Sequence, residues 1–282
     1  MVKAGRQWEN IDVWAEINGK YLLIIEDKTL TGEHSDQLQT YKERATAWCE
    51  ENSFQLVCVY LKTGSESASI LEKVRLQGFA VFGRRNFLDI LNGSGATNHI
   101  FVDFKEHLQA MEDAESQFLK KPIKEWGDPD WKGFYQALEK LRPLVKWEYV
   151  PNRGGGFWNA VLNWHEIKDY PYMQIEQGLL CFKIGEIDEN PSATRAHYHK
   201  MFMAHSAGTH GIRRPDRFGT GSYMTIAVVD RADWLGADES LVDMNGVVAR
   251  LGYFESVYLQ MIEKLRFDDT AASISLTMTV QP

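Results

Sequence analysis

One stretch constrains the fold of this chain more than any other: residues 11–28 read as two short strands joined at Asn18-Gly19. Asn-Gly between two apolar runs is a strong β-hairpin signal, because both residues accept the positive φ angles of a tight turn. Three charged residues lie at the end of the hairpin away from this turn: Asp12, Glu26 and Lys28. Charged groups are out of place in a buried hairpin, so the register of the two strands decides what they can do.

Two registers are open to this hairpin, and a slip of one residue exchanges the faces of a strand. With a three-residue loop, Ile17 faces Tyr21 and Asp12 lies directly opposite Glu26. With a two-residue loop, the two carboxylates point away from each other. We favour the three-residue loop, although like charges side by side cost energy unless a cation lies between them. Carboxylate oxygens are the ligands that Mg²⁺ prefers in proteins.

The opposite face of the hairpin is continuously apolar in this register, and we expect it to pack under a helix. Its members are Ile11, Val13, Ala15, Ile17, Tyr21, Leu23 and Ile25. The next helix is predicted to begin near Ser35, a good N-cap residue, and to end near residue 52. Gln37 and Tyr41 are four residues apart, so they share a face near the start of this helix.

The hairpin and the helix together resemble the PD-(D/E)XK nuclease superfamily. The pattern is an acid on the first strand, an acid-x-lysine triplet that closes the second strand, and a glutamine and a tyrosine on the next helix: Asp12, Glu26-Asp27-Lys28, Gln37 and Tyr41. The detailed match covers about residues 10–41. It implies an α/β fold of the restriction-endonuclease-like type, a mixed sheet flanked by helices, and metal-dependent hydrolysis of phosphodiester bonds.

The resemblance also implies a role for each residue. Asp12 and Glu26 would bind Mg²⁺ or Mn²⁺, together with the backbone carbonyl of Asp27. Lys28 would orient or deprotonate the attacking water, and we favour an orienting and charge-stabilising role. The glutamine and the tyrosine of the helix would complete the site as auxiliary residues.

The chain departs from the superfamily pattern in two ways. The middle residue of the triplet is Asp27, which adds a negative charge near the expected metal. Many members also carry a helix with a Glu upstream of the first acid, whereas eleven residues precede Asp12 here. Either that helix is missing or shortened, or Glu9 partly substitutes for its acid.

Two other interpretations of the charged trio stay open. The hairpin could be an ordinary surface ribbon in which Lys28 pairs with Glu26 or Asp12. Alternatively, the chain could be a catalytically silent binding or regulatory module on a nuclease-like scaffold, or a nuclease that a partner activates in a defence system. The acidic cluster with its retained lysine favours the enzyme, because an inactive scaffold does not need that pattern.

Strands at 54–61 and 79–82 alternate with helices at 67–77, 85–91 and 98–118, which is typical of an α/β domain over residues 1–120. Two prolines and a glycine then indicate a linker at 121–130. A second, α+β domain at 131–282 is expected to select substrate or partner. Its predicted strands are 147–150, 157–164, 172–176, 179–184, 223–229 and 273–280, with helices near 131–141, 192–204 and 244–265.

The net charge of the chain limits the classes of binding partner that we expect. The 282 residues carry a net charge of −8, which argues against a surface coated in positive charge for nonspecific nucleic-acid binding. A nuclease remains compatible, because metal ions neutralise part of a site and a local basic strip can contact phosphate. The arginines that could form such strips are Arg75, Arg84 and Arg85 in the first half and Arg213, Arg214 and Arg217 in the second. Nucleic acid, with DNA favoured, is the expected partner, and a protein partner or a homodimer is a further expectation.

The cysteines indicate the compartment. Cys49, Cys58 and Cys181 are odd in number and lack zinc-binding spacing, so neither a disulfide framework nor a zinc site is predicted. No apolar run reaches the roughly 18 residues needed to span a bilayer, and no signal-peptide segment is evident at the N-terminus. A cytoplasmic protein with no membrane partner is therefore expected.

Overall fold

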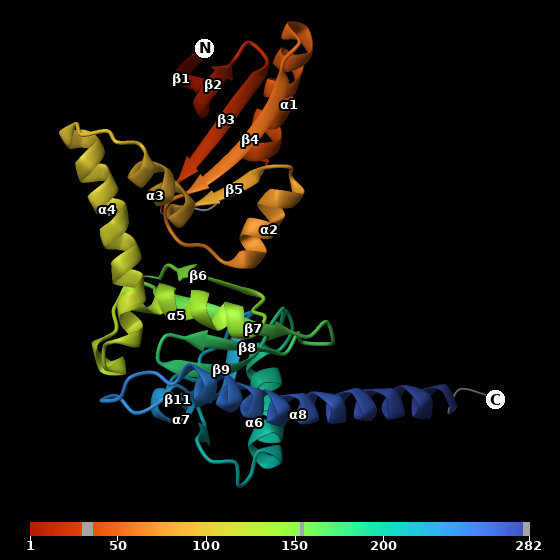
Figure 1. The fold of residues 1–282 in the computed structure, drawn as a ribbon. Helices are drawn as coiled ribbons and strands as arrows, with labels where there is room; N and C mark the ends of the chain where they lie inside the picture. The colour runs from red at the N-terminus through yellow and green to blue at the C-terminus, as the bar shows by residue number, and fades with distance from the viewer. Residues whose placement is uncertain (30–35, 153–154, 279–282) are drawn as a thin grey trace. The chain divides into compact units, whose positions relative to one another are not determined.

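The computed structural model describes residues 1–29, 36–152 and 155–278 (Figure 1). The chain divides into two compact units, Met1–Ser116 and Gln117–Pro282. Each unit has its own sheet, its own helices and its own hydrophobic core. The prediction that the chain combines helices and strands in two parts, each with its own sheet, is confirmed.

The first unit is built on a five-stranded mixed sheet with the order β1-β2-β3-β4-β5. The first three strands pair antiparallel, and the last three pair parallel. The strands are β1 (Val2–Trp8), β2 (Ile11–Ile17), β3 (Tyr21–Lys28), β4 (Gln55–Lys62) and β5 (Ala80–Gly83). The edge strand β1 was not predicted, although its sequence partly alternates apolar and polar residues.

The β2–β3 hairpin has the register predicted for a three-residue loop. Ile17 pairs with Tyr21, and the pairing continues to Val13 opposite Ile25. Asn18 and Gly19 take positive φ angles of 57° and 61°, as a tight turn with this sequence requires. If the register is continued by one residue, Asp12 of β2 lies opposite Glu26 of β3.

The face of the hairpin that packs under a helix is the opposite of the one predicted. Leu22 and Ile24 lie in the core beneath α1 (Gln37–Asn52), whereas Leu23 and Ile25 are only half-buried. The central strand β3 is apolar on both faces, as strands with parallel neighbours commonly are, so alternation could not identify the covered face. Because Glu26 shares a face with Leu22 and Ile24, the helix covers the acid rather than leaving it in solvent.

The helices of the first unit follow the predicted order. They are α1, α2 (Ala68–Leu76), α3 (Arg84–Gly93) and α4 (His99–Ser116). Ser35, predicted as the N-cap of α1, lies outside the described residues, and the helix begins at Gln37. The apolar residues of α4 are only partly buried: Leu108 packs against α3, whereas Ile100 is 83% exposed.

A buried arginine ties α3 and α4 to the end of β4. Arg84 donates hydrogen bonds to the carboxylates of Glu112 and Glu115, at 2.9 and 2.6 Å, and to the carbonyl of Thr63 at 3.0 Å. Ser65 donates a further hydrogen bond to Glu115 at 2.6 Å. The apolar core between α3 and α4 is small, so this polar network helps to hold the two helices to the sheet.

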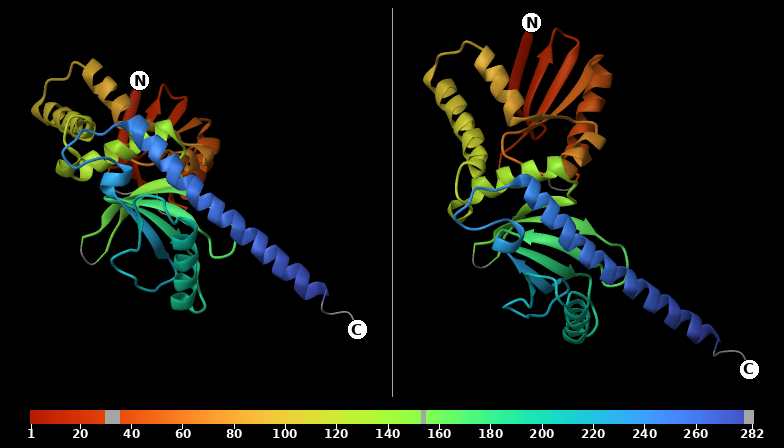
Figure 2. Two further views of the ribbon diagram at one scale, coloured as in Figure 1. Left: turned by 90° about the horizontal axis from the view of Figure 1, so that it is seen from below. Right: turned by 60° about the horizontal axis from the view of Figure 1, so that its bottom comes forward.

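The second unit is a six-stranded antiparallel sheet with the order β10-β11-β9-β8-β7-β6. Its strands are β6 (Lys146–Val150), β7 (Phe157–Trp164), β8 (Tyr172–Glu176), β9 (Leu179–Ile184), β10 (Ile212–Arg213) and β11 (Met224–Asp230). Its helices are α5 (Asp128–Leu141), α6 (Pro191–His205), α7 (Arg231–Trp234) and α8 (Met244–Met278). Helix α5 packs on β7, α6 packs on β11, and α8 contacts both helices (Figure 2). Apart from the short β10 and α7, these elements match the predicted ones closely up to residue 265.

Two predictions for this part of the chain are wrong. Residues 121–130 were expected to be a linker, but Ile123 is fully buried in the core of the second unit and Trp126 packs against it. Residues 273–278, predicted as the start of a final strand, continue α8, and residues 279–280 lie outside the described part. In both places tertiary packing or helix continuation overrides the local turn and strand signals.

Candidate active site at the end of the β2–β3 hairpin

Two carboxylates converge at the end of the hairpin. Asp12 stands at the start of β2, and its Oδ2 atom accepts a hydrogen bond from the backbone N–H of Asp27 at 3.0 Å. Glu26 stands near the end of β3 with a residue exposure of 2%. The strand register continues to Asp12 opposite Glu26, so both side chains leave the same face of the sheet, and Asp12 is close enough to raise the pKa of Glu26.

The Glu26 carboxylate is buried and only half satisfied. Its Oε1 atom lies 2.7 Å from the ammonium of Lys28, while its Oε2 atom is buried without a hydrogen-bond partner. Burial raises the pKa of Glu26 above its ordinary value; the hydrogen bond from Lys28 opposes this shift, and the charge of Asp12 adds to it. A buried carboxylate oxygen without a partner is costly, and a bound cation would satisfy it.

Helix α1 supplies the next part of the site. The ammonium of Lys28 donates to Oε1 of Gln37 at 3.1 Å, and Nε2 of Gln37 donates to the hydroxyl of Tyr41 at 2.7 Å. Lys28 is 12% exposed, and Tyr41 is buried in the core. A chain of contacts therefore runs from Glu26 through the lysine and the glutamine to the tyrosine, and the sequence pattern named all four residues.

The donors present fit a single hard divalent cation. Mg²⁺ typically takes one or two carboxylates from a protein and fills its remaining positions with water and substrate oxygens. Asp12 and Glu26 supply two carboxylates, and the second has a free buried oxygen. The side chain of Asp27 is exposed, so its backbone carbonyl is the group that the predicted metal role would use. Within the described residues, no group of three or more His, Cys, Asp and Glu side chains gathers as a metal cluster.

Glu9, the predicted substitute for the missing acid, contacts an arginine of α1. The guanidinium of Arg44, on α1, donates to the backbone carbonyl of Glu9 at 3.0 Å and lies 3.8 Å from its carboxylate. The carboxylate is 57% exposed. The residues before Asp12 form the strand β1 and the turn that follows it.

Two features near the site were missed by sequence reasoning. Lys62 closes β4 beside Lys28 in the parallel register, and it is 3% exposed with its ammonium 3.7 Å from Glu66. Its signal was a lysine at the end of an apolar strand, the same signal that marked Lys28. The second feature is an open polar depression of about 680 Å³ whose lining includes Asp12 together with Arg6 of the unpredicted strand β1.

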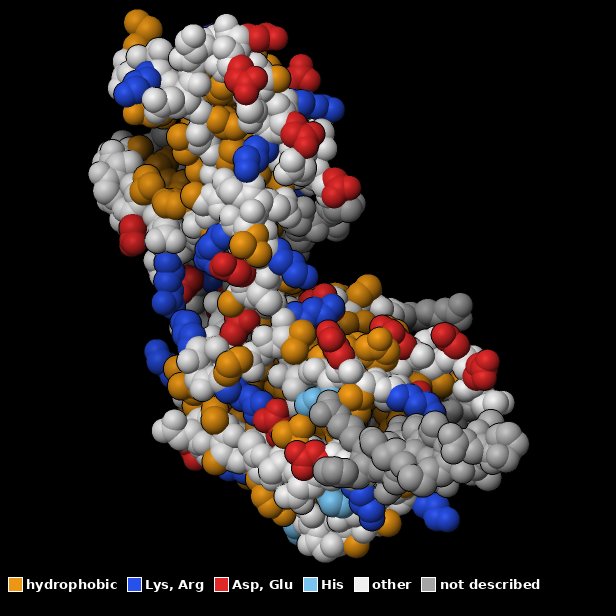
Figure 3. Space-filling view, turned by 90° about the vertical axis from the view of Figure 1, so that its right-hand side faces the viewer, with side chains coloured by type: hydrophobic (Ala, Val, Ile, Leu, Met, Phe, Trp, Pro, Cys, Tyr) orange, Lys and Arg blue, Asp and Glu red, His pale blue; other side chains and the backbone are white. Residues whose placement is uncertain are grey.

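The predicted basic strips are largely neutralised. The arginines that pair with nearby acids are Arg75, Arg84, Arg85 and Arg213. On the face drawn in Figure 3, Lys and Arg side chains lie among Asp and Glu side chains. Two other cations lie close to the candidate site: Arg6 lines the depression beside Asp12, and Lys28 pairs with Glu26.

The three cysteines are free and buried, and no helix in the described ranges has the length and apolar character to cross a membrane. No protein-family model, no curated protein and no solved structure matches this chain.

Proposed function

We propose that the unit Met1–Ser116 is a Mg²⁺-dependent nuclease that hydrolyses phosphodiester bonds, with DNA as its substrate. One observation carries the proposal: the buried carboxylate of Glu26, with an unpartnered Oε2 atom, lies against Asp12 on one side and Lys28 on the other. An ordinary surface hairpin would leave these groups in water. A buried carboxylate oxygen that has no partner and lies beside a second acid is costly, and a bound cation would offset this cost.

The arrangement meets the demands of phosphodiester hydrolysis. A phosphodiester is already negative, so the protein must concentrate positive charge at the scissile phosphate and position a water in line with the leaving oxygen. When bound, Mg²⁺ supplies positive charge there and promotes ionisation of water. Asp12 and Glu26 would hold it. The ammonium of Lys28, fixed by Glu26 and Gln37, would orient the water and stabilise the charge that develops on the phosphate.

Replacing Lys28 with Ala tests this function directly. Wild type and Lys28→Ala are incubated with plasmid, single-stranded DNA or RNA in the presence of Mg²⁺, Mn²⁺ or EDTA. We expect wild type to cleave with either metal and not with EDTA, and the variant to cleave about 10²–10³-fold more slowly, because one positioned charge-stabilising group is lost. Cleavage that neither the chelator nor the substitution affects would contradict the proposal. Nucleic-acid binding without cleavage would favour the silent-module alternative.

Arg6 is expected to contact substrate phosphate from the depression beside Asp12. We predict that Arg6→Ala weakens binding of single strands and of duplexes alike. The slope of log affinity against log salt should fall by about 0.7–0.9, the contribution of one released counterion. Binding titrations at several salt concentrations measure this slope. Arg75→Ala is the matched control, because Arg75 already pairs with Glu72 and should leave the slope unchanged.

A further inference from the structure

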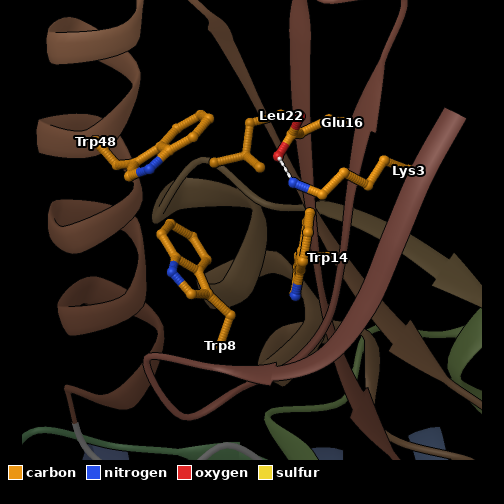
Figure 4. A pocket seen from close by; sticks show the side chains of 6 residues that line it. All are labelled: Lys3, Trp8, Trp14, Glu16, Leu22 and Trp48. Atoms are coloured by element: carbon orange, nitrogen blue, oxygen red, sulfur yellow. Dashed lines mark hydrogen bonds and ion pairs between the residues drawn. The ribbon is translucent and has the colours of Figure 1, made fainter. Parts of the chain in front are cut away.

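A pocket lined by three tryptophans opens beside α1. It has a volume of about 270 Å³ and is lined by Lys3, Trp8, Trp14, Glu16, Leu22 and Trp48 (Figure 4). All three indoles are partly exposed. Ligand pockets usually span about 300–1,000 Å³, so this one suits a single ring system rather than a larger molecule.

Trp14 forms a flat wall of the pocket. Gly5 lies opposite it on β1, and a side chain there would meet the indole, since its first carbon would lie 2.7 Å from the ring. The glycine therefore lets the ring lie flat against the strand. In Figure 4 this ring is seen edge-on, with one face turned toward Trp8 across the hollow. The ring centroids of Trp8 and Trp14 are 6.4 Å apart and their planes are tilted by 59°. The face of Trp14 that is turned toward Trp8 therefore borders the pocket.

The two charged residues that line the pocket, Lys3 and Glu16, indicate which charge a bound ring should carry. The ammonium of Lys3 lies 3.0 Å from the carboxylate of Glu16 and 5.3 Å from the centroid of Trp14. An anionic ligand would find the lysine already neutralised, and a cationic ligand would find the glutamate already neutralised. A neutral ring with hydrogen-bond donors and acceptors at its edge can use both groups without breaking the pair's charge balance. Nucleobases have this character.

The pocket continues the strand face that carries the candidate active site. Trp14 is two residues after Asp12 on β2, so both side chains leave the same face of the strand about 7 Å apart. That spacing is comparable to the distance between neighbouring nucleotides of an extended strand. We propose that the pocket binds an unpaired base, stacked on Trp14, next to the phosphodiester at Asp12 and Glu26. The enzyme would then act on single-stranded DNA or on frayed ends; this inference rests on the proposed nuclease function.

Binding in EDTA tests the inference without any cleavage step. Fluorescence anisotropy measures the affinity of labelled single-stranded DNA, of a blunt duplex, and of an abasic strand of equal length, which carries phosphates but no bases. We expect wild type to bind the single strand about tenfold more tightly than the abasic strand, in line with stacking of one base on an aromatic ring. Trp14→Leu should lose this preference, and Trp14→Phe, which keeps a ring, should retain most of it.

Quenching of the intrinsic tryptophan emission of wild type by the single strand, but not by the abasic strand, gives a second measurement that needs no variant. Equal affinity for the two strands, or an unchanged preference in a folded Trp14→Leu variant, would overturn the inference. Emission quenched by tetramethylammonium but by no DNA strand would also overturn it, in favour of a cation site. The binding assay contains EDTA, so it tests the pocket separately from cleavage. Base-dependent binding without any cleavage in Mg²⁺ would refute the proposed nuclease function alone. Cleavage in Mg²⁺ without a preference for bases would refute the proposed base pocket alone.

Discussion

Glu26→Gln is expected to abolish Mg²⁺-dependent cleavage and, in the same protein, to stabilise the metal-free fold. Loss of the carboxylate removes the charge that would hold the cation, so cleavage should fall by at least about 10³-fold. The amide has nearly the same shape, its oxygen can still accept the hydrogen bond from Lys28, and it carries no charge to desolvate. Few substitutions at an ordinary surface hairpin would lower activity and raise stability together.

The stability effect has a defined pH dependence. Burial raises the pKa of Glu26 above its ordinary value of 4.5, so the folded state binds the proton more tightly than the unfolded state. The free energy of unfolding of the metal-free protein therefore falls as pH rises through the window between 4.5 and the folded pKa. Above that window the destabilisation is complete and Glu26→Gln is the more stable protein. Below pH 4.5 the acid is protonated in both states, and the difference should disappear.

Thermal unfolding in EDTA at several pH values, repeated with Mg²⁺ at neutral pH, measures both effects. Mg²⁺ should raise the melting temperature of wild type, because it binds the folded state, and should leave Glu26→Gln unchanged. Glu51→Gln is the control for loss of a charge, since Glu51 is an exposed residue of α1. The prediction fails if Glu26→Gln is less stable than wild type at neutral pH, or if its melting temperature still rises with Mg²⁺. Glu26 would then not be a desolvated, metal-binding carboxylate.

Arg84→Ala is expected to destabilise the first unit by about 3–5 kcal/mol. The guanidinium is buried, and its removal takes away the cation that lies 2.6 Å from the buried carboxylate of Glu115. Breaking a buried pair by removing one member costs this much because the remaining charge stays desolvated. Urea unfolding, followed by a probe in this unit, gives the difference in the free energy of unfolding.

Arg85→Ala is the matched control, because the neighbouring residue also pairs with Glu112 but is 74% exposed. Exposed ion pairs contribute about 0–1 kcal/mol, so this variant should unfold within that range of wild type. If both variants lost the same small amount, the Arg84 network would be a surface feature rather than the attachment of α3 and α4 to the sheet.

Local signals determined much of the site. The Asn18-Gly19 turn and the two-residue period of the strands determine the hairpin register, because a slip would reverse every side chain. That register alone brings the acids of β2 and β3 together. The spacing of Gln37 and Tyr41 likewise predicted their shared face, which the structure orients toward Lys28. These features depend on residues close in the chain, and the sequence therefore contained them.

Tertiary structure decided which face of the hairpin is buried and what completes the site. Both faces of β3 are apolar, so only the packing of α1 shows that Glu26 is enclosed and that Leu23 and Ile25 are the more open side. The pairing of β1 with β2 created the tryptophan pocket and brought Arg6 to the depression beside Asp12. Burial and long-range strand pairing depend on contacts between distant residues, and no local pattern in a single sequence encodes them uniquely.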